Sequence, residues 1–507
     1  MRAEAGDPAC DVVVVGGGIA GLVAARELAL AGLRPVVFEA WTAPGGAVGR
    51  HTVAGLQLDA GAESFATRDG IVAALLTDLG LGTSITAPSR AGAWVQLPAG
   101  PATLPRTGLL GIPADPWAGD VRRTIGLVGA LRASADRWLA ADRGTVRSDG
   151  TAASLGELVA TRMGPRVLDR LVTPVVAGVH AVDPSEAAVD AVAPGLRAAL
   201  GAHGSLGEAV RSLRALAPAG AAVAGLNGGM FGLVDALVAE ITARGGRIEP
   251  AARVISIDRG TGGGGSASPA QQPGWVVRLA PARGGTERTV LARRLVLALP
   301  GPAAADLLAP HVPGLAAERP DAGADVVLAT LVLDAPALDA APRGTGVLVA
   351  PNVSGIRARA LTHATSKWAW LAAAAGPGRH VLRLSYGRAA GTGSRPGPDL
   401  ARLPLADLTV VALRDASALL GVPLTASQLV GSARVRWAQS LPHPSPAHQA
   451  TAAKVRAAVA SLAGLEVCGS WLAGNGLAAV VADAQRAGRR LVVDAEGTPE
   501  AASVNGR

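Results

Sequence analysis

Residues 12–21 of the chain read VVVVGGGIAG, and this stretch decides the fold. Residues 12–15 form a continuous β-branched run, which is typical of a strand buried on both faces of a sheet. A Gly-x-Gly-x-x-Gly pattern follows at once, and residues 19–31 then carry helix formers before Gly32. A strand, a glycine turn and a helix in this order predict the first unit of a doubly wound α/β domain.

The three glycines of this pattern each suit a dinucleotide site. Gly16 permits the tight turn, Gly18 leaves room for a pyrophosphate, and Gly21 lets the helix pack closely against the strand. The helix start offers free N–H groups and a partial positive charge to the phosphates. A second strand over 35–39 ends at Glu39, where a carboxylate binds a ribose 2′-OH and disfavours a 2′-phosphate. The whole unit therefore predicts nucleotide binding rather than a purely structural turn.

The composition limits the class of protein. With 507 residues, 49% hydrophobic and 17% charged, the chain is long enough for roughly three domains with large cores. Only two of the 47 Lys and Arg residues are lysine, which together with the abundant Ala, Gly and Pro indicates G+C-rich codon usage. The net charge of +8 is therefore not taken as a sign of nucleic-acid binding. Two cysteines, Cys10 and Cys468, exclude a disulfide framework and favour a reduced, cytoplasmic compartment.

No segment of the sequence reads as a membrane span, a signal peptide or a metal site. The first eleven residues carry acidic side chains and no apolar core. The most apolar stretch, 215–234, contains Pro218 and Asn227 and is rich in alanine, which favours a buried segment or loop. A peripheral contact with a membrane is left open. The eight histidines form no HExxH and the cysteines no CxxC, so no metal is expected.

The remaining pattern divides into a helical middle and a strand-rich second half. Residues 325–435 alternate short strand-like pieces with turns, which predicts a mixed or antiparallel sheet. Residues 465–468 read as a last apolar strand, and a glycine-rich turn and a helix over 478–487 follow. The other predicted elements are helices at 64–80, 121–141, 154–163, 167–172, 206–216 and 231–244, and strands at 253–258, 275–279 and 295–299.

Two further segments favour FAD over NAD. Pro44, Gly45 and Gly46 follow the acid directly, with Arg50 close behind, and DAGAESF comes next at 59–65. The late turn at 469–477 offers a second set of backbone N–H groups. A site closed by both ends of the chain suits the extended FAD molecule, whereas a simple doubly wound NAD enzyme has no need of the late segment.

The chain resembles the amine-oxidase-like flavoproteins and, within them, the oxygen-dependent porphyrinogen oxidases. GGGIAGLVAARELA, VVFEA and PGG carry the general flavoprotein signature. Ala47, Ala62 and Val182 differ from the family pattern. The narrower similarities are DAGAESF (59–65), SLGELVATRMGPRVLDRLVTPVVAGVHAVDP (154–184), GLNGGMFGLVDALVAEI (225–241), RWAQSLPHPSPAHQ (436–449) and CGSWLAGNGLAAVVADA (468–484).

This resemblance implies an α/β fold with a FAD-binding domain of the two-nucleotide-fold type, a mixed-sheet substrate domain and a helical domain. We expect a discontinuous FAD-binding domain formed by residues 1–88, 245–300 and 440–507. The substrate-binding sheet domain is expected to combine 89–109 with 301–439, and the mainly helical domain to span 110–244.

The resemblance also implies a non-covalent FAD. Cys468 lies next to the expected site and is a candidate attachment point, but a buried strand cysteine is the commoner case. Arg90 is the candidate for a substrate carboxylate, and no catalytic residue is named. Trp437 matches a position near the flavin in relatives, with a core or interface tryptophan as the equal alternative. The expected cofactor-binding residues are Gly16, Gly17, Gly18, Ile19, Ala20, Gly21, Glu39, Gly45, Gly46, Arg50, Gly61, Ala62, Glu63, Ser64, Val254, Trp437, Ser470, Asn475, Gly476 and Leu477.

The resemblance implies the six-electron oxidation of a porphyrinogen by O₂ in haem biosynthesis, with release of H₂O₂. No motif distinguishes the substrates, but the G+C-rich codon usage indicates an actinobacterium-like source, in which this family usually makes coproporphyrin III, so coproporphyrinogen III is the expected substrate. Aromaticity of the product drives this reaction, so no acid–base pair is required. Protoporphyrinogen IX is the close alternative substrate. Two other classes stay open: another flavin amine oxidase or desaturase, and a non-catalytic relative that keeps the fold. The sequence predicts no oligomeric state.

Overall fold

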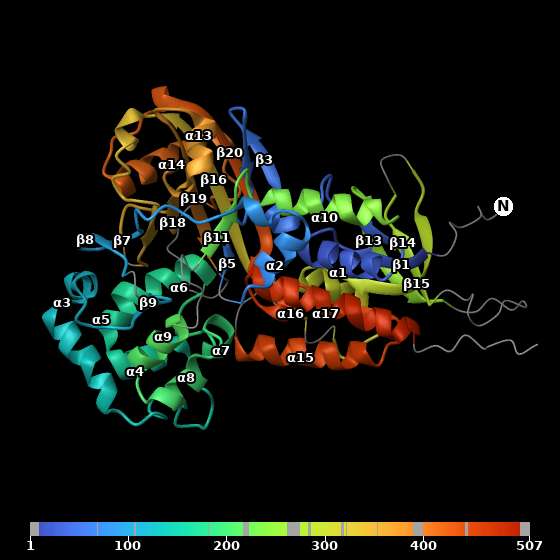
Figure 1. Cartoon of the computed structure of the whole chain (residues 1–507), viewed down its shortest axis with the longest axis horizontal. Coiled ribbons are helices and arrows are strands. Elements are labelled where there is room, and N and C mark those ends of the chain that lie inside the picture. The colour runs from blue at the N-terminus through green and yellow to red at the C-terminus, as the bar shows by residue number, and fades with distance from the viewer. Residues whose placement is uncertain are drawn as a thin grey trace, which may run out of the picture.

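The computed structural model shows three bodies side by side, one made of helices and two built on sheets (Figure 1). Among the helices in the described part of the chain, none combines the length and the apolar character that a membrane span requires. Part of the apolar stretch 215–234, namely 216–222, lies outside this description. The residues not described are 1–9, 68, 106–107, 181, 216–222, 261–273, 282–284, 316–318, 321, 352, 389–398, 442–444 and 497–507.

The first sheet contains the strand that precedes the glycine turn. Strand β1 (Cys10–Val15) pairs in parallel with β2 (Pro35–Phe38) and with β15 (Arg288–Leu297). Val12, Val13 and Val14 are fully buried, which confirms the predicted two-sided burial. The other members are β12 (Arg247–Glu249), β13 (Val254–Arg259), β14 (Trp275–Leu279) and β21 (Leu465–Val467), in the order β12-β2-β1-β15-β14-β13, with β21 also paired to β15.

Three helices next to this sheet bring the two ends of the chain together. Helix α1 (Ile19–Leu30) packs against α10 (Phe231–Ala243) and α17 (Leu477–Glu496), the blue, green and red helices of Figure 1. Every residue of α1 from Ile19 to Ala29 is buried, so the helix has no solvent face until its last residue. A Cβ on Gly488 of α17 would lie 2.7 Å from the Cβ of Glu27, which shows how closely the two helices approach.

The second sheet has seven strands in the order β20-β16-β19-β18-β17-β7-β8. Only the β17–β7 pair is parallel, so the sheet is mixed, as predicted. Helix α14 (Leu405–Leu420) packs on one face through its buried leucines and alanines. The strands are β7 (Trp94–Leu97), β8 (Gly100–Thr103), β16 (Ala324–Asp334), β17 (Gly346–Val349), β18 (Ala360–His363), β19 (Arg379–Arg388) and β20 (Leu429–Leu441).

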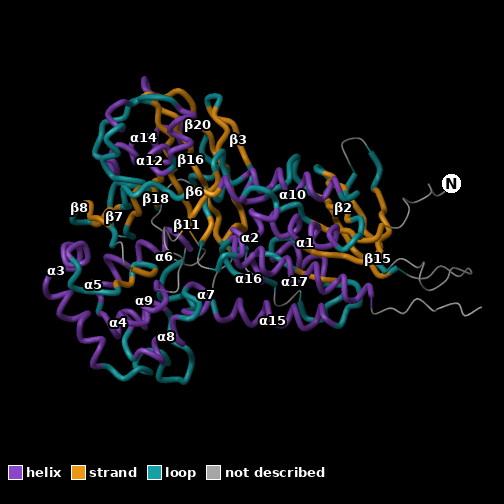
Figure 2. Tube along the Cα trace, in the orientation of Figure 1, coloured by secondary structure: helices purple, strands orange, loops and turns teal. Residues whose placement is uncertain are grey.

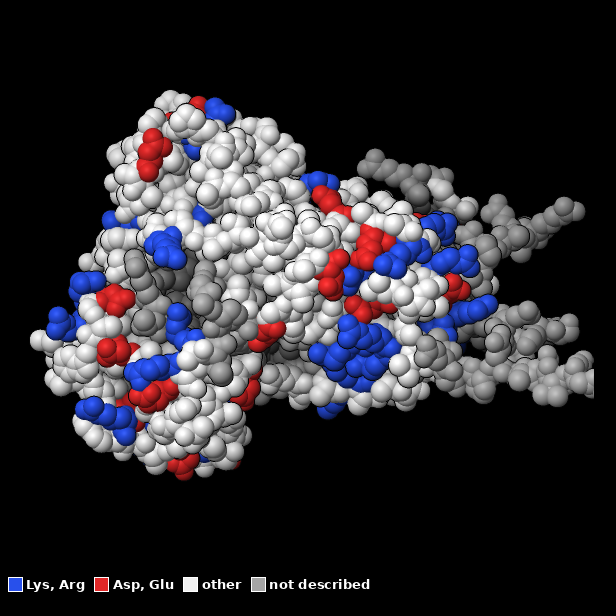
Figure 3. All heavy atoms as spheres, in the orientation of Figure 1, with Lys and Arg blue, Asp and Glu red and all other residues white. Residues whose placement is uncertain are grey.

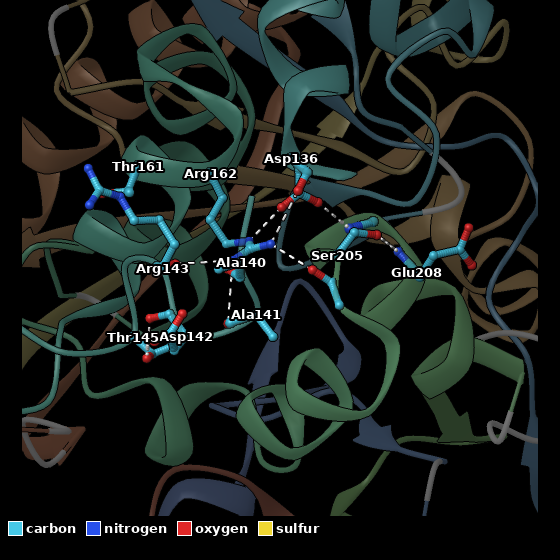
Figure 4. A network of polar contacts seen from close by, with 12 residues as sticks. Asp136, Ala140, Ala141, Asp142, Arg143, Thr145, Thr161, Arg162, Ser205 and Glu208 are labelled. Carbon is cyan, nitrogen blue, oxygen red and sulfur yellow. Dashed lines mark hydrogen bonds and ion pairs between the residues drawn. The ribbon is translucent and has the colours of Figure 1, made fainter. Parts of the chain in front are cut away.

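The helical body is held by a buried ion pair, which Figure 4 shows from close by. Arg162 is fully buried, and its Nε donates to Asp136 Oδ1 at 2.5 Å. Its other N–H groups donate to the carbonyls of Ala140, Arg143 and Gly204, among others. The helices are α3 (Gly119–Ser134), α4 (Leu155–Met163), α5 (Pro165–Val167), α6 (Thr173–His180), α7 (Val189–Val192), α8 (Leu196–His203) and α9 (Leu206–Ala215).

Several predicted boundaries are wrong, and Figure 2 shows in colour which parts of the chain are helix, strand and loop. The helix expected over 64–80 begins only at Ile71, because Phe65 and Ala66 form a strand against residues 223–224. The helix expected over 121–141 ends at Ser134 and bends at Gly126, whose φ is 74°. The strand expected over 295–299 is the ten-residue β15, and helix α14 was not predicted among the turns of 325–435.

The other strands and α-helices complete these bodies and the connections between them. They are β3 (Arg50–Val53), β4 (Leu56–Asp59), β5 (Phe65–Ala66), β6 (Ile85–Thr86), β9 (Gly108–Leu109), β10 (Ile112–Pro113), β11 (Val223–Leu226), α2 (Ile71–Asp78), α11 (Gly301–Leu308), α12 (Ala364–Lys367), α13 (Ala369–Ala375), α15 (Pro446–Ala460) and α16 (Ser470–Ala473).

Acidic and basic side chains are mixed over the face shown in Figure 3, with a basic patch over α17. The arginines of this helix are paired rather than isolated. Arg489 lies 2.8 Å from Glu27 and Arg490 lies 2.8 Å from Glu466. The patch therefore carries less net charge than its colour in Figure 3 implies.

Candidate active site

The glycine turn between β1 and α1 leaves space where the sequence predicts a pyrophosphate. A Cβ on Gly16 would lie 2.4 Å from Ala298 O, and one on Gly21 would lie 1.8 Å from Gly16 O. These two positions therefore require glycine for packing. The nearest atom to a Cβ on Gly18 is Gly46 Cα at 4.0 Å, so the space above Gly18 is open. Helix α1 begins directly behind it, which fits a phosphate held by the helix N-terminus.

Glu39 is fixed at the end of β2 by backbone groups. Its Oε2 accepts a hydrogen bond from the Gly17 N–H and its Oε1 one from the Trp41 N–H, both at 2.8 Å. The Ala252 N–H donates to the Glu39 carbonyl at 2.8 Å, two residues before the half-buried Val254. The structure therefore brings Val254 to the same end of the sheet as the predicted ribose site.

The second glycine pair packs directly on the first turn. The Gly45 N–H donates to Gly17 O at 2.8 Å, and a Cβ on Gly46 would lie 3.2 Å from Gly18 Cα. Arg50, a few residues on, is half exposed and forms an ion pair with Asp235 of α10 at 3.1 Å. The predicted arginine thus ties the start of β3 to α10.

The loop at residues 60–64, which we call the cofactor loop, is held by its backbone. The Ala62 N–H donates to Ala47 O at 2.8 Å, and a Cβ on Gly61 would lie 2.2 Å from that same oxygen. Trp437 of β20 donates its Nε1–H to Ala60 O at 3.0 Å. The sequence-predicted Trp437 therefore lies against the cofactor loop, where Ser64 is partly buried.

Glu63 of this loop is the centre of a buried ionic group, which we call the Glu63 cluster: Glu63, Lys367 and Arg383. Lys367 Nζ lies 2.5 Å from Glu63 Oε1, and Arg383 Nη1 lies 2.8 Å from Glu63 Oε2. Arg383 also donates to Gly61 O at 2.6 Å. Burial by itself raises the pKa of the Glu63 carboxyl, but the two cations outweigh it and lower that pKa to about 2.

Two more titratable groups lie near the cluster. Burial, followed by the charge of Arg383, lowers the pKa of His51 to about 4, so this imidazole is neutral at pH 7. Burial raises the pKa of Asp59 to about 6, although its hydrogen bonds with the backbone of Met230 and Phe231 oppose the rise.

The C-terminal turn lies beside the start of α1. Cys468 is fully buried with its Sγ 3.9 Å from Ala20 O, and burial raises the pKa of its thiol. The Gly469 N–H donates to Asp483 of α17 at 3.2 Å, which fixes the turn before Ser470. The turn then continues through the partly buried Asn475 and the exposed Gly476 to Leu477 at the start of α17.

Sequence reasoning missed Lys367 and Arg383, and it named Arg90 only as a candidate. Arg90 is exposed and follows Ser89, whose N–H donates to Lys367 O at 2.8 Å, so its backbone lies beside the Glu63 cluster. One available signal was compositional, because Lys367 is one of only two lysines in the chain.

Among the described residues, no group of three or more His, Cys, Asp or Glu side chains is arranged to hold a metal.

Comparison with known proteins connects this geometry to a family. Residues 19–495 match the model of the flavin-containing amine oxidoreductases. The chain is 31% identical over 485 residues to a coproporphyrinogen III oxidase of Mycobacterium leprae (strain TN), covering 94% of this chain and 96% of the relative. The relative of the same name from Mycobacterium tuberculosis (strain ATCC 25618 / H37Rv) is also 31% identical, covering 94% of this chain and 95% of the relative.

Solved structures agree on the fold. A putative protoporphyrinogen oxidase from Exiguobacterium sp. 255-15 superposes with a TM-score of 0.76 and 25% identity, covering 96% of this chain and all of that one. Cyclohexylamine oxidase from Brevibacterium oxydans IH-35A superposes with a TM-score of 0.62 and 17% identity, covering 96% of this chain and all of that one.

Proposed function

The chain belongs to the flavin-containing amine oxidoreductases and is an oxidoreductase that uses FAD, and from this premise we propose that it oxidises coproporphyrinogen III to coproporphyrin III. The observation that carries the proposal is the 31% identity to coproporphyrinogen III oxidases over 94% of the chain. The open space above Gly18 supports the FAD that the proposal requires, because a dinucleotide cofactor needs that space.

FAD, when bound, accepts electrons in pairs and passes them to O₂, so six electrons require three turnovers and release H₂O₂. We assign the pyrophosphate to the turn at Gly16–Gly18 and the ribose to Glu39. We assign the flavin end to the cofactor loop and the C-terminal turn at 475–477. The protein holds the substrate beside the flavin and excludes water. Product aromaticity supplies the driving force, so we name no catalytic acid or base.

We also propose the domain division expected from the sequence, with the first sheet in the FAD-binding domain and the second in the substrate-binding domain. The first sheet combines strands from residues 10–38, 247–297 and 465–467, which supports a discontinuous domain. The second sheet combines 94–103 with 324–441. We place the reaction in the cytoplasm, in line with the two free cysteines.

A direct assay tests the substrate. The purified holoenzyme is incubated in air with coproporphyrinogen III or with protoporphyrinogen IX, and porphyrin fluorescence is followed against enzyme-free autoxidation. We expect the faster enzyme-dependent rise with coproporphyrinogen. Protoporphyrinogen IX is the second candidate because a putative protoporphyrinogen oxidase superposes with a TM-score of 0.76. A faster rise of fluorescence with protoporphyrinogen IX would make it the assigned substrate. Two rates equal to autoxidation would exclude both substrates.

A further inference from the structure

The Glu63 cluster joins two parts of the molecule that are far apart in the sequence. Glu63 belongs to the cofactor loop, whereas Lys367 ends α12 and Arg383 lies in β19 of the second sheet. The two ion pairs span 304 and 320 residues. Because Arg383 also donates to Gly61 O, one side chain of the second sheet holds the cofactor loop at two points.

A short chain of backbone contacts connects this cluster to the phosphate turn. Gly45 bonds to Gly17, and two residues later Ala47 O accepts the Ala62 N–H next to Glu63. With the ribose assigned to Glu39, the flavin half of a bound FAD would extend away from Glu39, along Gly45 and the cofactor loop. The cluster therefore lies behind the loop that borders the flavin end.

The cluster carries an excess of positive charge. Two cations face one carboxylate, and all three side chains are at most 17% exposed. At pH 7 the neighbouring His51 is neutral, whereas the nearby Asp59, with a pKa of about 6, is mostly ionised and adds a negative charge beside the cluster. Because water is largely excluded from these side chains, their charges act more strongly on neighbouring groups than charges in bulk water do.

The choice of lysine at position 367 is itself informative. The chain uses arginine for all but two of its 47 Lys and Arg residues, and the other lysine, Lys454, is exposed on α15. Lysine is a compact point charge with three rotatable donors, and only one hydrogen bond, to Glu63, is formed by Lys367 within the described part of the chain. A lysine ammonium therefore acts mainly through its electric field, whereas an arginine guanidinium also acts through several hydrogen bonds in a fixed planar geometry.

We propose that Lys367 and Arg383 are positioning residues for the flavin end of FAD, fixing the cofactor loop through Glu63 and raising the reduction potential of the bound cofactor by their charge. Reduction adds electron density to the flavin, so a nearby cation favours it and a nearby carboxylate opposes it. The proposal rests on FAD binding as assigned above and is independent of which substrate is oxidised.

The test is a spectroelectrochemical titration of the midpoint potential of bound FAD in the purified holoenzyme, with no porphyrinogen present. Lys367→Met removes a positive charge and is expected to shift the potential to more negative values. Glu63→Gln removes a negative charge and is expected to shift it to more positive values. A purely structural disturbance would not give opposite signs, so two shifts in the same direction, or no shift, overturn the proposal.

Two further variants keep the test decisive if Glu63→Gln fails to fold. Lys367→Arg keeps the charge and is expected to retain the wild-type potential, whereas Lys367→Met does not. Lys454→Met removes the same charge from an exposed position on α15 and is expected to leave the potential unchanged. Equal potentials for Lys367→Met, Lys454→Met and the wild type refute the electrostatic role. Because no substrate is added, the result stands even if the porphyrinogen assay fails.

Discussion

Replacement of Gly18 by valine should separate cofactor binding from folding. The φ and ψ of Gly18 are −71° and 177°, which valine adopts readily. The nearest atom to the new Cβ would be Gly46 Cα at 4.0 Å, an ordinary contact. The apoprotein should therefore fold normally, while the side chain fills the space assigned to the pyrophosphate.

The expected loss of FAD affinity in Gly18→Val follows from the hydrogen bonds that the N-terminus of α1 can donate. The first N–H groups of α1 have no partner within the helix, so they are available to phosphate oxygens. Losing two hydrogen bonds to a charged group, at about 1.5–3 kcal/mol each, weakens FAD binding roughly a hundredfold to ten-thousandfold. The assay compares visible flavin absorbance per protein, and the Kd of reconstituted apoprotein, for Gly18→Val and wild type.

Thermal unfolding of the two apoproteins provides the control. We expect the two apoproteins to unfold at the same temperature, although the Gly18→Val protein has lost its flavin. A Gly18→Val protein that keeps full flavin content and wild-type affinity would refute the placement of the pyrophosphate at this turn.

Three other substitutions test the packing and the charges. Gly21→Ala places a Cβ 1.8 Å from Gly16 O, so we expect loss of flavin together with a lower unfolding temperature of the apoprotein, and a normal unfolding temperature would contradict the packing argument. Arg162→Met leaves Asp136 buried without its cation, which should cost about 3–5 kcal/mol in urea denaturation, with partial recovery in the double variant Arg162→Met/Asp136→Leu. Asp59→Asn tests pH dependence in the apoprotein: the folded carboxyl keeps its proton up to pH about 6 and the unfolded one up to about 3.8, so wild-type stability falls as pH rises through this window. The fall is about 3 kcal/mol at 1.36 kcal/mol per pKa unit, and the variant should lack it; identical pH profiles would contradict the raised pKa.

The sequence was most informative where contacts are local. The glycine turn, β1 and α1 follow one another directly, so the period of the apolar residues and the glycine spacing suffice to predict them. Trp275–Leu279 was likewise predicted with its full bounds. Prediction failed where a distant partner decides the structure, as at Phe65 and Ala66, which form a strand because residues 223–224 pair with them.

In the candidate site, too, residues in a local motif could be predicted, and residues that depend on a distant partner could not. Gly16, Gly18 and Glu39 could be named from spacing alone, and the structure brings them together at one end of the first sheet. Lys367 and Arg383 could not, because their partner Glu63 lies more than 300 residues earlier in the chain. The sequence around an isolated lysine or a strand arginine does not indicate which distant carboxylate will form an ion pair with it.

The contact between α1 and α17 has a consequence for how the protein matures. Helix α1 is synthesised well before α17, yet Gly488 of α17 packs against Glu27 of α1. The part of α1 that packs against α17 therefore stays without its partner until α17 has been synthesised. A chain cut before Leu477 should leave buried side chains of α1 without the helix that packs on them.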